Sequence, residues 1–209
     1  MVELHNRGST IFCKGAEMMK KDALIAELTM RPVIAAVRGQ AEAEKAAKSP
    51  VAAVFLLGGS ILTLKDTVQA LRDARKAVFV HMDLCEGLGR DAAAICWCAR
   101  NLRPDGMIST KSQLLHAARE EGLMTIQRMF LMDSASLVSG MKLLKGNPPD
   151  MVELMPGLVT KAISAVSGKL SIPVIAGGMI TEADEVADAL KAGALAVSTS
   201  DPVLWRMGV

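Results

Sequence analysis

The chain has 209 residues, with 24 basic and 22 acidic side chains and a formal net charge of +2 at pH 7. This length suits one domain and excludes a large multidomain assembly, since domains usually run about 100 to 200 residues. Hydrophobic residues make up 51% of the chain and aromatic residues only 3%. This composition favours a folded domain with an aliphatic core, and it disfavours a disordered polymer or a nucleic-acid surface built from stacking aromatics.

The cysteines and the apolar segments indicate an intracellular protein. Cys13, Cys85, Cys96 and Cys98 have no disulfide-framework spacing, so we expect reduced thiols. The chain has no apolar run of about 18 residues that would span a membrane, and its start lacks the order of a secretion signal. We therefore expect a cytoplasmic protein with no membrane partner.

From Met30 onward, short apolar runs alternate with longer stretches of helical spacing, as in βα units of a parallel sheet. The expected strands are Pro32–Val37, Val51–Gly58, Ala77–Leu84, Gly106–Thr110, Met124–Leu131, Met151–Gly157, Pro173–Gly178 and Ala196–Ser200. Helices are expected between them, for example over residues 63–76, 90–101, 112–122, 133–146 and 181–193.

Eight βα units predict an α/β fold of the closed (β/α)8 TIM-barrel type, compact and with short loops. Residues 30–209 would form this barrel, and residues 1–29 an N-terminal extension, partly disordered, that includes a first helix. An open flavodoxin-like sheet needs only about five strands and is the alternative. In either fold, ligands bind at the carboxyl ends of the strands, so candidate residues are sought there.

The last two strands end in residues that suit a phosphate group. The seventh is followed by Gly177 and Gly178, and the eighth ends in Ser198, Thr199 and Ser200 before an expected short helix. In barrels, the loops after these two strands often bind phosphate, because glycines let backbone N–H groups approach, hydroxyls donate and a helix dipole favours the anion. The alternative is a tight turn beside a helix cap.

The third strand ends in three polar residues, His81, Asp83 and Glu86. Because strand side chains alternate, His81 and Asp83 are expected on one face, with Glu86 in the loop that follows. They suit hydrogen bonds to polyol hydroxyls, acid–base chemistry or, less well, Mg²⁺ binding. A buried hydrogen-bonded pair with Glu86 as a cap is the structural alternative.

Basic residues at other strand ends suit an anionic ligand. Lys111 follows the fourth strand, Arg128 lies on the fifth and Arg38 ends the first. Arginine can make two parallel hydrogen bonds to phosphate, although both Lys111 and Arg128 could instead be solvated surface residues. Glu153 on the sixth strand can reach either Arg128 or a ligand hydroxyl. The chain has no Walker, dinucleotide or zinc-finger motif, so no cofactor is expected.

Five blocks of sequence resemble the glycerol-3-phosphate-responsive antiterminator family, also called the glycerol uptake operon antiterminator family. They are HMDLCEGLGRD, GMISTKSQLLHAAREEGLMTIQRMFLMDS, PDMVELMPG, PVIAGGMIT and AGALAVSTSDPVLW, within the span from Arg31 to Trp205. The resemblance implies a TIM barrel that is a regulator and not an enzyme. Such a regulator senses glycerol 3-phosphate, binds the leader of glycerol-utilisation messenger RNA and prevents a terminator hairpin from forming.

The resemblance marks site residues in those blocks and leaves other properties open. The marked residues are His81, Asp83, Glu86, Lys111, Arg128, Glu153, Gly177, Gly178, Ser198, Thr199 and Ser200. The expected partners are glycerol 3-phosphate and leader messenger RNA, and a homo-oligomer remains open. Cys85, Lys111 and Ser60 depart from the usual residues of the family. The alternative function is a phosphosugar enzyme of aldolase or isomerase type, with Lys111 as Schiff-base residue and Glu86 or Glu153 as base.

Overall fold

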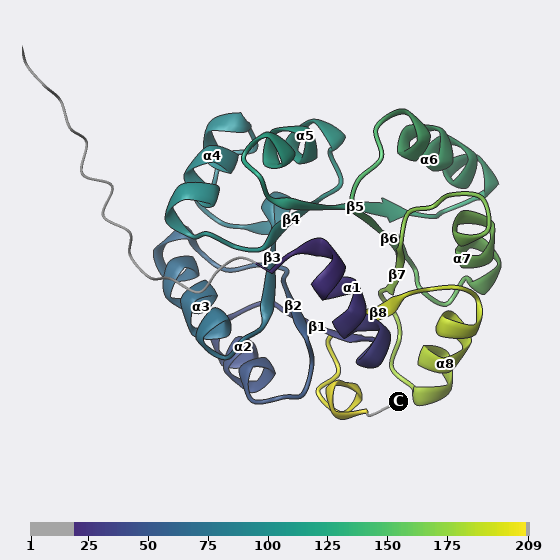
Figure 1. The fold of residues 1–209 in the computed structure, drawn as a ribbon, viewed down its shortest axis with the longest axis horizontal. Helices are drawn as coiled ribbons and strands as arrows, with labels where there is room; N and C mark the ends of the chain where they lie inside the picture. Colours follow the sequence, from purple (N-terminus) through teal and green to yellow (C-terminus); the bar gives the residue numbers. More distant parts are fainter. Residues whose placement is uncertain (1–18, 208–209) are drawn as a thin grey trace, which may run out of the picture.

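The computed structural model describes residues 19–207, in which eight parallel strands close into a barrel surrounded by helices (Figure 1). The strands are β1 (Val33–Val37), β2 (Ala53–Leu56), β3 (Ala77–His81), β4 (Gly106–Ser109), β5 (Met124–Phe130), β6 (Met151–Met155), β7 (Val174–Gly177) and β8 (Ala196–Thr199). The helices are α1 (Lys21–Met30), α2 (Gln40–Ala47), α3 (Ile61–Asp73), α4 (Ala92–Asn101), α5 (Ser112–Glu120), α6 (Ser134–Gly146), α7 (Thr160–Ser167) and α8 (Ala183–Lys191). The predicted (β/α)8 barrel is confirmed, and the open-sheet alternative is wrong because β8 pairs with β1.

The strands are almost continuously buried because each has one face inside the barrel and the other under the helices. Inside the barrel, Phe55 and Phe79 meet edge to face with ring centroids 5.7 Å apart. On the outer face, residues such as Val54 and Val80 pack with the inner sides of the helices. This double burial explains why the strands read as apolar runs without alternation.

Helix α1 closes the amino-terminal end of the barrel. Leu24 and Leu28 lie four residues apart and therefore on one face of the helix, and both are fully buried in the interior cluster that contains Ile34 and Phe55. Figure 1 shows α1 lying across the middle of the ring of strands. The carboxyl end of the barrel, where the candidate residues lie, is consequently the end left for a ligand. Much of the expected N-terminal extension, residues 1–18, lies outside the described residues.

Several helices begin at side chains that bond their first-turn N–H groups, which fixes the loops at the carboxyl end of the barrel. The Ser60 side chain accepts from Leu62 N at the start of α3, and the Asp91 side chain caps α4. A capping box, Asp133 with Ser136, begins α6. Such caps satisfy N–H groups that have no partner inside the helix.

Two local expectations are wrong. The third strand ends at His81 and not at Leu84, because residues Met82–Leu84 form a 3-10 turn, η1, in which the alternation of a strand no longer applies. The helix expected after the eighth strand is only a second 3-10 turn, η2 (Leu204–Arg206). A single turn of this kind offers little of the dipole that a full helix would direct at an anion.

In the part of the chain from residue 19 to residue 207, none of the helices has the length and apolar character that crossing a lipid bilayer requires.

Candidate ligand site at the carboxyl end of the barrel

A row of buried polar side chains crosses the inside of the barrel on β5, β6 and β8. Arg128 and Glu153 are register partners on β5 and β6, and Arg128 Nε donates to Glu153 Oε2 at 2.5 Å. Ser198 Oγ on β8 donates to Glu153 Oε1 at 2.6 Å. Glu153 is only 1% exposed and Arg128 5%, so this ion pair is shielded from water and its partners fix one another's position.

Glycine is required at residue 177 for this row to form. Gly177 lies on β7 between β6 and β8, and a Cβ placed there would be 2.5 Å from Glu153 Oε1 and 2.6 Å from Ser198 Oγ. Both distances are too short for atoms that are not bonded. The first of the two glycines therefore makes room for the Ser198–Glu153 hydrogen bond.

The row lies at one side of a hollow of about 240 Å³ at the mouth of the barrel. The lining includes seven residues singled out from the sequence: Arg38, Arg128, Glu153, Gly178, Ser198, Thr199 and Ser200. The hollow is smaller than the pockets of about 300 to 1,000 Å³ that hold drug-sized ligands. Its size and polar lining suit a small metabolite.

Residues of the loops after β7 and β8 line this hollow and have backbone N–H groups without a partner among the described residues. Gly178 and Met179 both have positive φ angles, +75° and +64°, and both line the hollow. The N–H groups of Gly178, Met179 and Ser200 donate no hydrogen bond to any residue of the described chain. A left-handed conformation is uncommon for methionine, and such strained positions concentrate at functional sites. These donors are available to an anion.

A second group of polar side chains lies beside the row, at the ends of β3 and β4. Asp83 Oδ2 accepts from Ser109 Oγ at 2.9 Å and from Thr110 N at 2.8 Å. Burial opposes ionisation of Asp83, but the hydrogen bonds from Thr110 and Ser109 outweigh it, so the pKa of this carboxyl lies below its usual value. Asp83 is thus an anchored carboxylate.

His81 is a neutral imidazole at physiological pH. Burial, followed by the nearby charge of Arg128, lowers the pKa of His81 to about 4. His81 Nδ1 lies 3.8 Å from Asp83 Oδ2, which is too long for a hydrogen bond, and with a neutral ring this contact is not an ion pair. His81 and Asp83 do lie together as expected, but they are brought together by the turn η1 and not by strand alternation.

Four buried polar atoms at this end of the barrel have no hydrogen-bond partner among the described residues. They are both ring nitrogens of His81, Asp83 Oδ1 and Arg128 Nη2. Buried polar groups in folded proteins are nearly always satisfied, so a cluster of four calls for an explanation. Of these three residues only Arg128 lines the hollow, so a polar ligand would satisfy all four atoms only by extending from the hollow toward His81 and Asp83.

The remaining candidates from the sequence lie apart from the hollow or have other contacts. Lys111 and Glu86 are exposed and do not line the hollow. The Thr199 hydroxyl donates to Ile180 O, so it holds the β7–β8 loops together. Arg38 is exposed at the rim, where its backbone N–H donates to Glu42 Oε2.

Sequence reasoning missed Ser109 and Thr110, which hold the Asp83 carboxylate. Their position at the end of the fourth expected strand was the sequence feature that could have identified these two hydroxyl residues as part of the site. It also missed Met155, whose Cε would lie 2.6 Å from a Cβ at Gly178. That methionine lines the hollow through a packing contact between β6 and the β7 loop, and no short sequence pattern reports such a contact.

Comparison with known proteins places this chain in a family. A family model described as glycerol-3-phosphate responsive antiterminator matches residues 33–205. The chain is 35% identical over 180 residues to the uncharacterized protein YgcP of Escherichia coli strain K12, a match that spans 86% of this chain and 94% of that one.

Solved structures agree with that match. The chain resembles a glycerol uptake operon antiterminator regulatory protein of Listeria monocytogenes at 34% identity and a TM-score of 0.80, over 84% of this chain and 95% of that one. For a glycerol uptake operon antiterminator-related protein of Thermotoga maritima, the values are 31% and 0.76, over 85% and 99%. Orotidine 5′-phosphate decarboxylase of Pyrococcus horikoshii, at 16% identity and a TM-score of 0.60, shares the fold alone. The chain belongs to the glycerol-3-phosphate responsive antiterminator family.

Proposed function

We propose that this chain senses glycerol 3-phosphate at the mouth of the barrel and acts as a transcription antiterminator by binding the leader of glycerol-utilisation messenger RNA. One observation carries the effector half of the proposal. The hollow beside β7 and β8 combines the Arg128 guanidinium with backbone N–H groups of two loops that donate to no described residue. That combination is suited to a phosphate group.

The phosphate rests on the β7 and β8 loops in this proposal. The N–H groups of Gly178, Met179 and Ser200 donate to its oxygens, and the free Nη2 of Arg128 adds positive charge. Both oxygens of Glu153 already accept hydrogen bonds from protein groups, so this carboxylate orients Arg128 and is not turned toward the anion. Arg38 on the rim supplies a second cation.

The glycerol hydroxyls meet His81 and Asp83. A neutral imidazole carries one N–H donor and one acceptor nitrogen, so it can bond two hydroxyl groups, or one that donates and accepts. Asp83 Oδ1 is a free acceptor, while Oδ2 is held by Ser109 and Thr110. These groups would distinguish glycerol 3-phosphate from inorganic phosphate.

The regulatory half of the proposal is supported by the family to which the chain belongs and by the two antiterminator-type structures that it resembles. Contact with RNA must depend on arginine and lysine, because the chain has no tyrosine and few other aromatic residues. An aldolase or isomerase is disfavoured by the site. A Schiff-base lysine is activated by desolvation or by a neighbouring cation, whereas Lys111 is exposed and lies outside the hollow.

Calorimetry with three compounds tests the effector assignment. Glycerol 3-phosphate is expected to bind more tightly than inorganic phosphate, and glycerol much more weakly than either, because the phosphate provides most of the interaction. The exposed Ser200 allows a mild perturbation, since Ser200→Asp places a negative charge beside the phosphate. It is expected to abolish binding without lowering the melting temperature, whereas Ser139→Asp, on the exposed side of α6, leaves binding unchanged.

Two results would contradict the proposal. Equal affinity for glycerol and glycerol 3-phosphate would remove the phosphate site. Prolonged incubation with glycerol 3-phosphate or dihydroxyacetone phosphate can be monitored by phosphorus NMR. Chemical conversion of either compound would favour the alternative function as an enzyme. For the regulatory half, glycerol 3-phosphate is expected to tighten binding of the leader RNA, and no change in RNA affinity would count against it.

A further inference from the structure

Charge is unevenly distributed between the two ends of the barrel. In the described chain, α1 with its flanking residues and the loops that lead into the strands carry eight basic and five acidic side chains. The loops that follow the strands, with the segment after β8, carry four basic and six acidic ones. Interaction with helix dipoles favours basic residues in last turns, but apart from those of α1 the residues counted here lie outside the helices. In the described chain, the loops at the amino-terminal end of the barrel are therefore the more positive ones.

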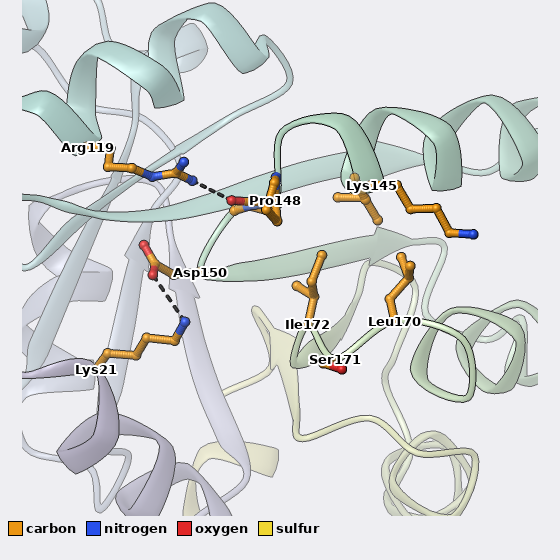
Figure 2. A pocket seen from close by; sticks show the side chains of 10 residues that line it. Lys21, Arg119, Lys145, Pro148, Asp150, Leu170, Ser171 and Ile172 are labelled. Carbon is orange, nitrogen blue, oxygen red and sulfur yellow. Dashed lines mark hydrogen bonds and ion pairs between the residues drawn. The ribbon is translucent and has the colours of Figure 1, made fainter.

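A hollow of about 420 Å³ lies at this positive end (Figure 2). Its lining residues come from helix ends and from loops that lead into strands, whereas the effector site is lined by the strand ends and the loops that follow them. The charged residues that line the hollow at the positive end are Lys21 at the start of α1, Arg119 in the last turn of α5, Lys145 in the last turn of α6, and Asp150 just before β6. Except for one serine, the other lining residues are apolar and include Pro148. The hollow thus combines three cations with an apolar floor.

The single acidic residue of this hollow is already occupied. Asp150 Oδ1 lies 3.2 Å from Lys21 Nζ, and Asp150 Oδ2 accepts from both Thr125 N and Thr125 Oγ1 at 2.9 Å. Figure 2 shows Lys21 and Asp150 facing each other on one side of the hollow. After this pairing, Arg119 and Lys145 leave a net positive charge on the lining.

Arg119 and Lys145 retain donors for an anion. Arg119 Nη2 donates to Pro148 O, which fixes the guanidinium against the proline-rich loop. The side chain of Lys145 makes no hydrogen bond or ion pair with any residue from 19 to 207. A fixed guanidinium with apolar neighbours can stack on a nucleobase and bond a phosphate, which is how many proteins bind unpaired RNA bases.

We propose that this hollow, with the positive end of the barrel around it, is the surface that binds RNA, so that effector and RNA occupy opposite ends of the molecule. The proposal rests on the proposed antiterminator function and names the surface that this function uses. The acidic loops at the mouth disfavour RNA there, because they repel phosphates. Strand β6 connects the two ends, since Asp150 immediately precedes it and Glu153 lies on it three residues further along.

The test measures RNA affinity by fluorescence anisotropy over a range of salt concentrations. The probe is the transcribed 5′ leader of the host's glycerol-utilisation messenger RNA, labelled with fluorescein, with glycerol 3-phosphate present. The variants are Lys145→Gln, and Arg119→Gln combined with Lys145→Gln. Lys161→Gln, exposed in the first turn of α7 at the mouth end, removes the same charge as a matched control.

The double variant is expected to bind the leader about tenfold more weakly or worse at physiological salt. Each lost phosphate contact is expected to lower the slope of log affinity against log salt by about 0.7 to 0.9. Lys145→Gln alone is expected to lower the slope by about one such step, and an unchanged melting temperature is expected because this exposed side chain makes no hydrogen bond or ion pair with the described residues. Lys161→Gln is expected to match the parent chain.

The outcomes separate this inference from the proposed function. If the parent chain binds leader RNA and the double variant binds it equally well, or if Lys161→Gln loses as much, the hollow does not hold RNA and serves another partner, while the antiterminator function stands. If the parent chain binds no leader RNA although it binds glycerol 3-phosphate, the RNA half of the proposed function is wrong and this inference is wrong with it.

Discussion

Removing the Glu153 carboxylate tests the buried row on which the site is built. In Glu153→Met, Arg128 keeps its charge in a position that is 5% exposed and loses its only acidic partner within hydrogen-bond distance among the described residues. Breaking a buried ion pair from one side costs about 3 to 5 kcal/mol. For a domain of this size, 1 kcal/mol shifts the melting temperature by about 2 to 4 °C, so a fall of about 6 to 20 °C is expected.

Thermal unfolding followed by circular dichroism measures this fall in a double-mutant cycle. Arg128→Met is expected to destabilise as well, because it leaves the Glu153 carboxyl buried without its cationic partner. The double variant is expected to recover much of the loss, since replacing a buried ion pair with apolar side chains is often neutral. Glu44→Met on the exposed face of α2 is the control and is expected to change little.

Two results would show that the Arg128–Glu153 pair does not stabilise the fold. A melting temperature of Glu153→Met within about 2 °C of the parent would mean that Arg128 is solvated and that the pair adds nothing. A double variant as unstable as the sum of the single variants would show that the two side chains do not interact.

Two further predictions concern other residues of the site. Because the pKa of folded His81 is about 4, below its ordinary 6.5, the folded state binds fewer protons than the unfolded state between these values, and stability falls as pH is lowered through that range. The free energy of unfolding falls by up to about 3 kcal/mol over this range. Between pH 7 and pH 4 the melting temperature is expected to change less for His81→Gln than for the parent chain, and an equal change in both would be inconsistent with this. Gly177→Ala places a methyl group against Glu153 and Ser198 and is expected to cost about 1 to 3 kcal/mol and to weaken effector binding. Gly146→Ala, where a Cβ meets nothing within 4 Å, serves as its control and is expected to be neutral or stabilising.

The barrel could be predicted from the sequence because every strand is buried on both faces. Eight apolar runs separated by helical segments leave few other arrangements. The ends of the elements were harder to predict. Strand β3 stops at His81 because η1 turns the chain and the Asp83 carboxylate binds the end of β4, a contact with Thr110 between residues 27 positions apart.

That the loops after β7 and β8 adjoin each other could be predicted, because the fold fixes which strand ends are neighbours. Gly177 and Ser198 are register partners on β7 and β8, so a closed barrel brings their loops together. The pairing of Glu153 remained open in the sequence, where both Arg128 and a ligand hydroxyl were within reach, and the structure shows the bond to Arg128. The partner of Glu153 depends on side-chain geometry across two strands. The spacing of residues along one strand gives no information on that geometry.

The hollow at the amino-terminal end was not predicted at all. Lys21, Arg119 and Lys145 come from three helices that are distant in sequence, and no motif connects them. Only the closure of the barrel, with α1 across its end, places them around one depression.

A crystal structure of the chain with glycerol 3-phosphate tests the effector site most directly. We expect phosphate oxygens within hydrogen-bond distance of the Gly178 and Ser200 N–H groups and of Arg128 Nη2, with the glycerol hydroxyls directed at His81 and Asp83. A phosphate found elsewhere, for example in the amino-terminal hollow against Arg119 and Lys145 while the mouth contains only water, would contradict it.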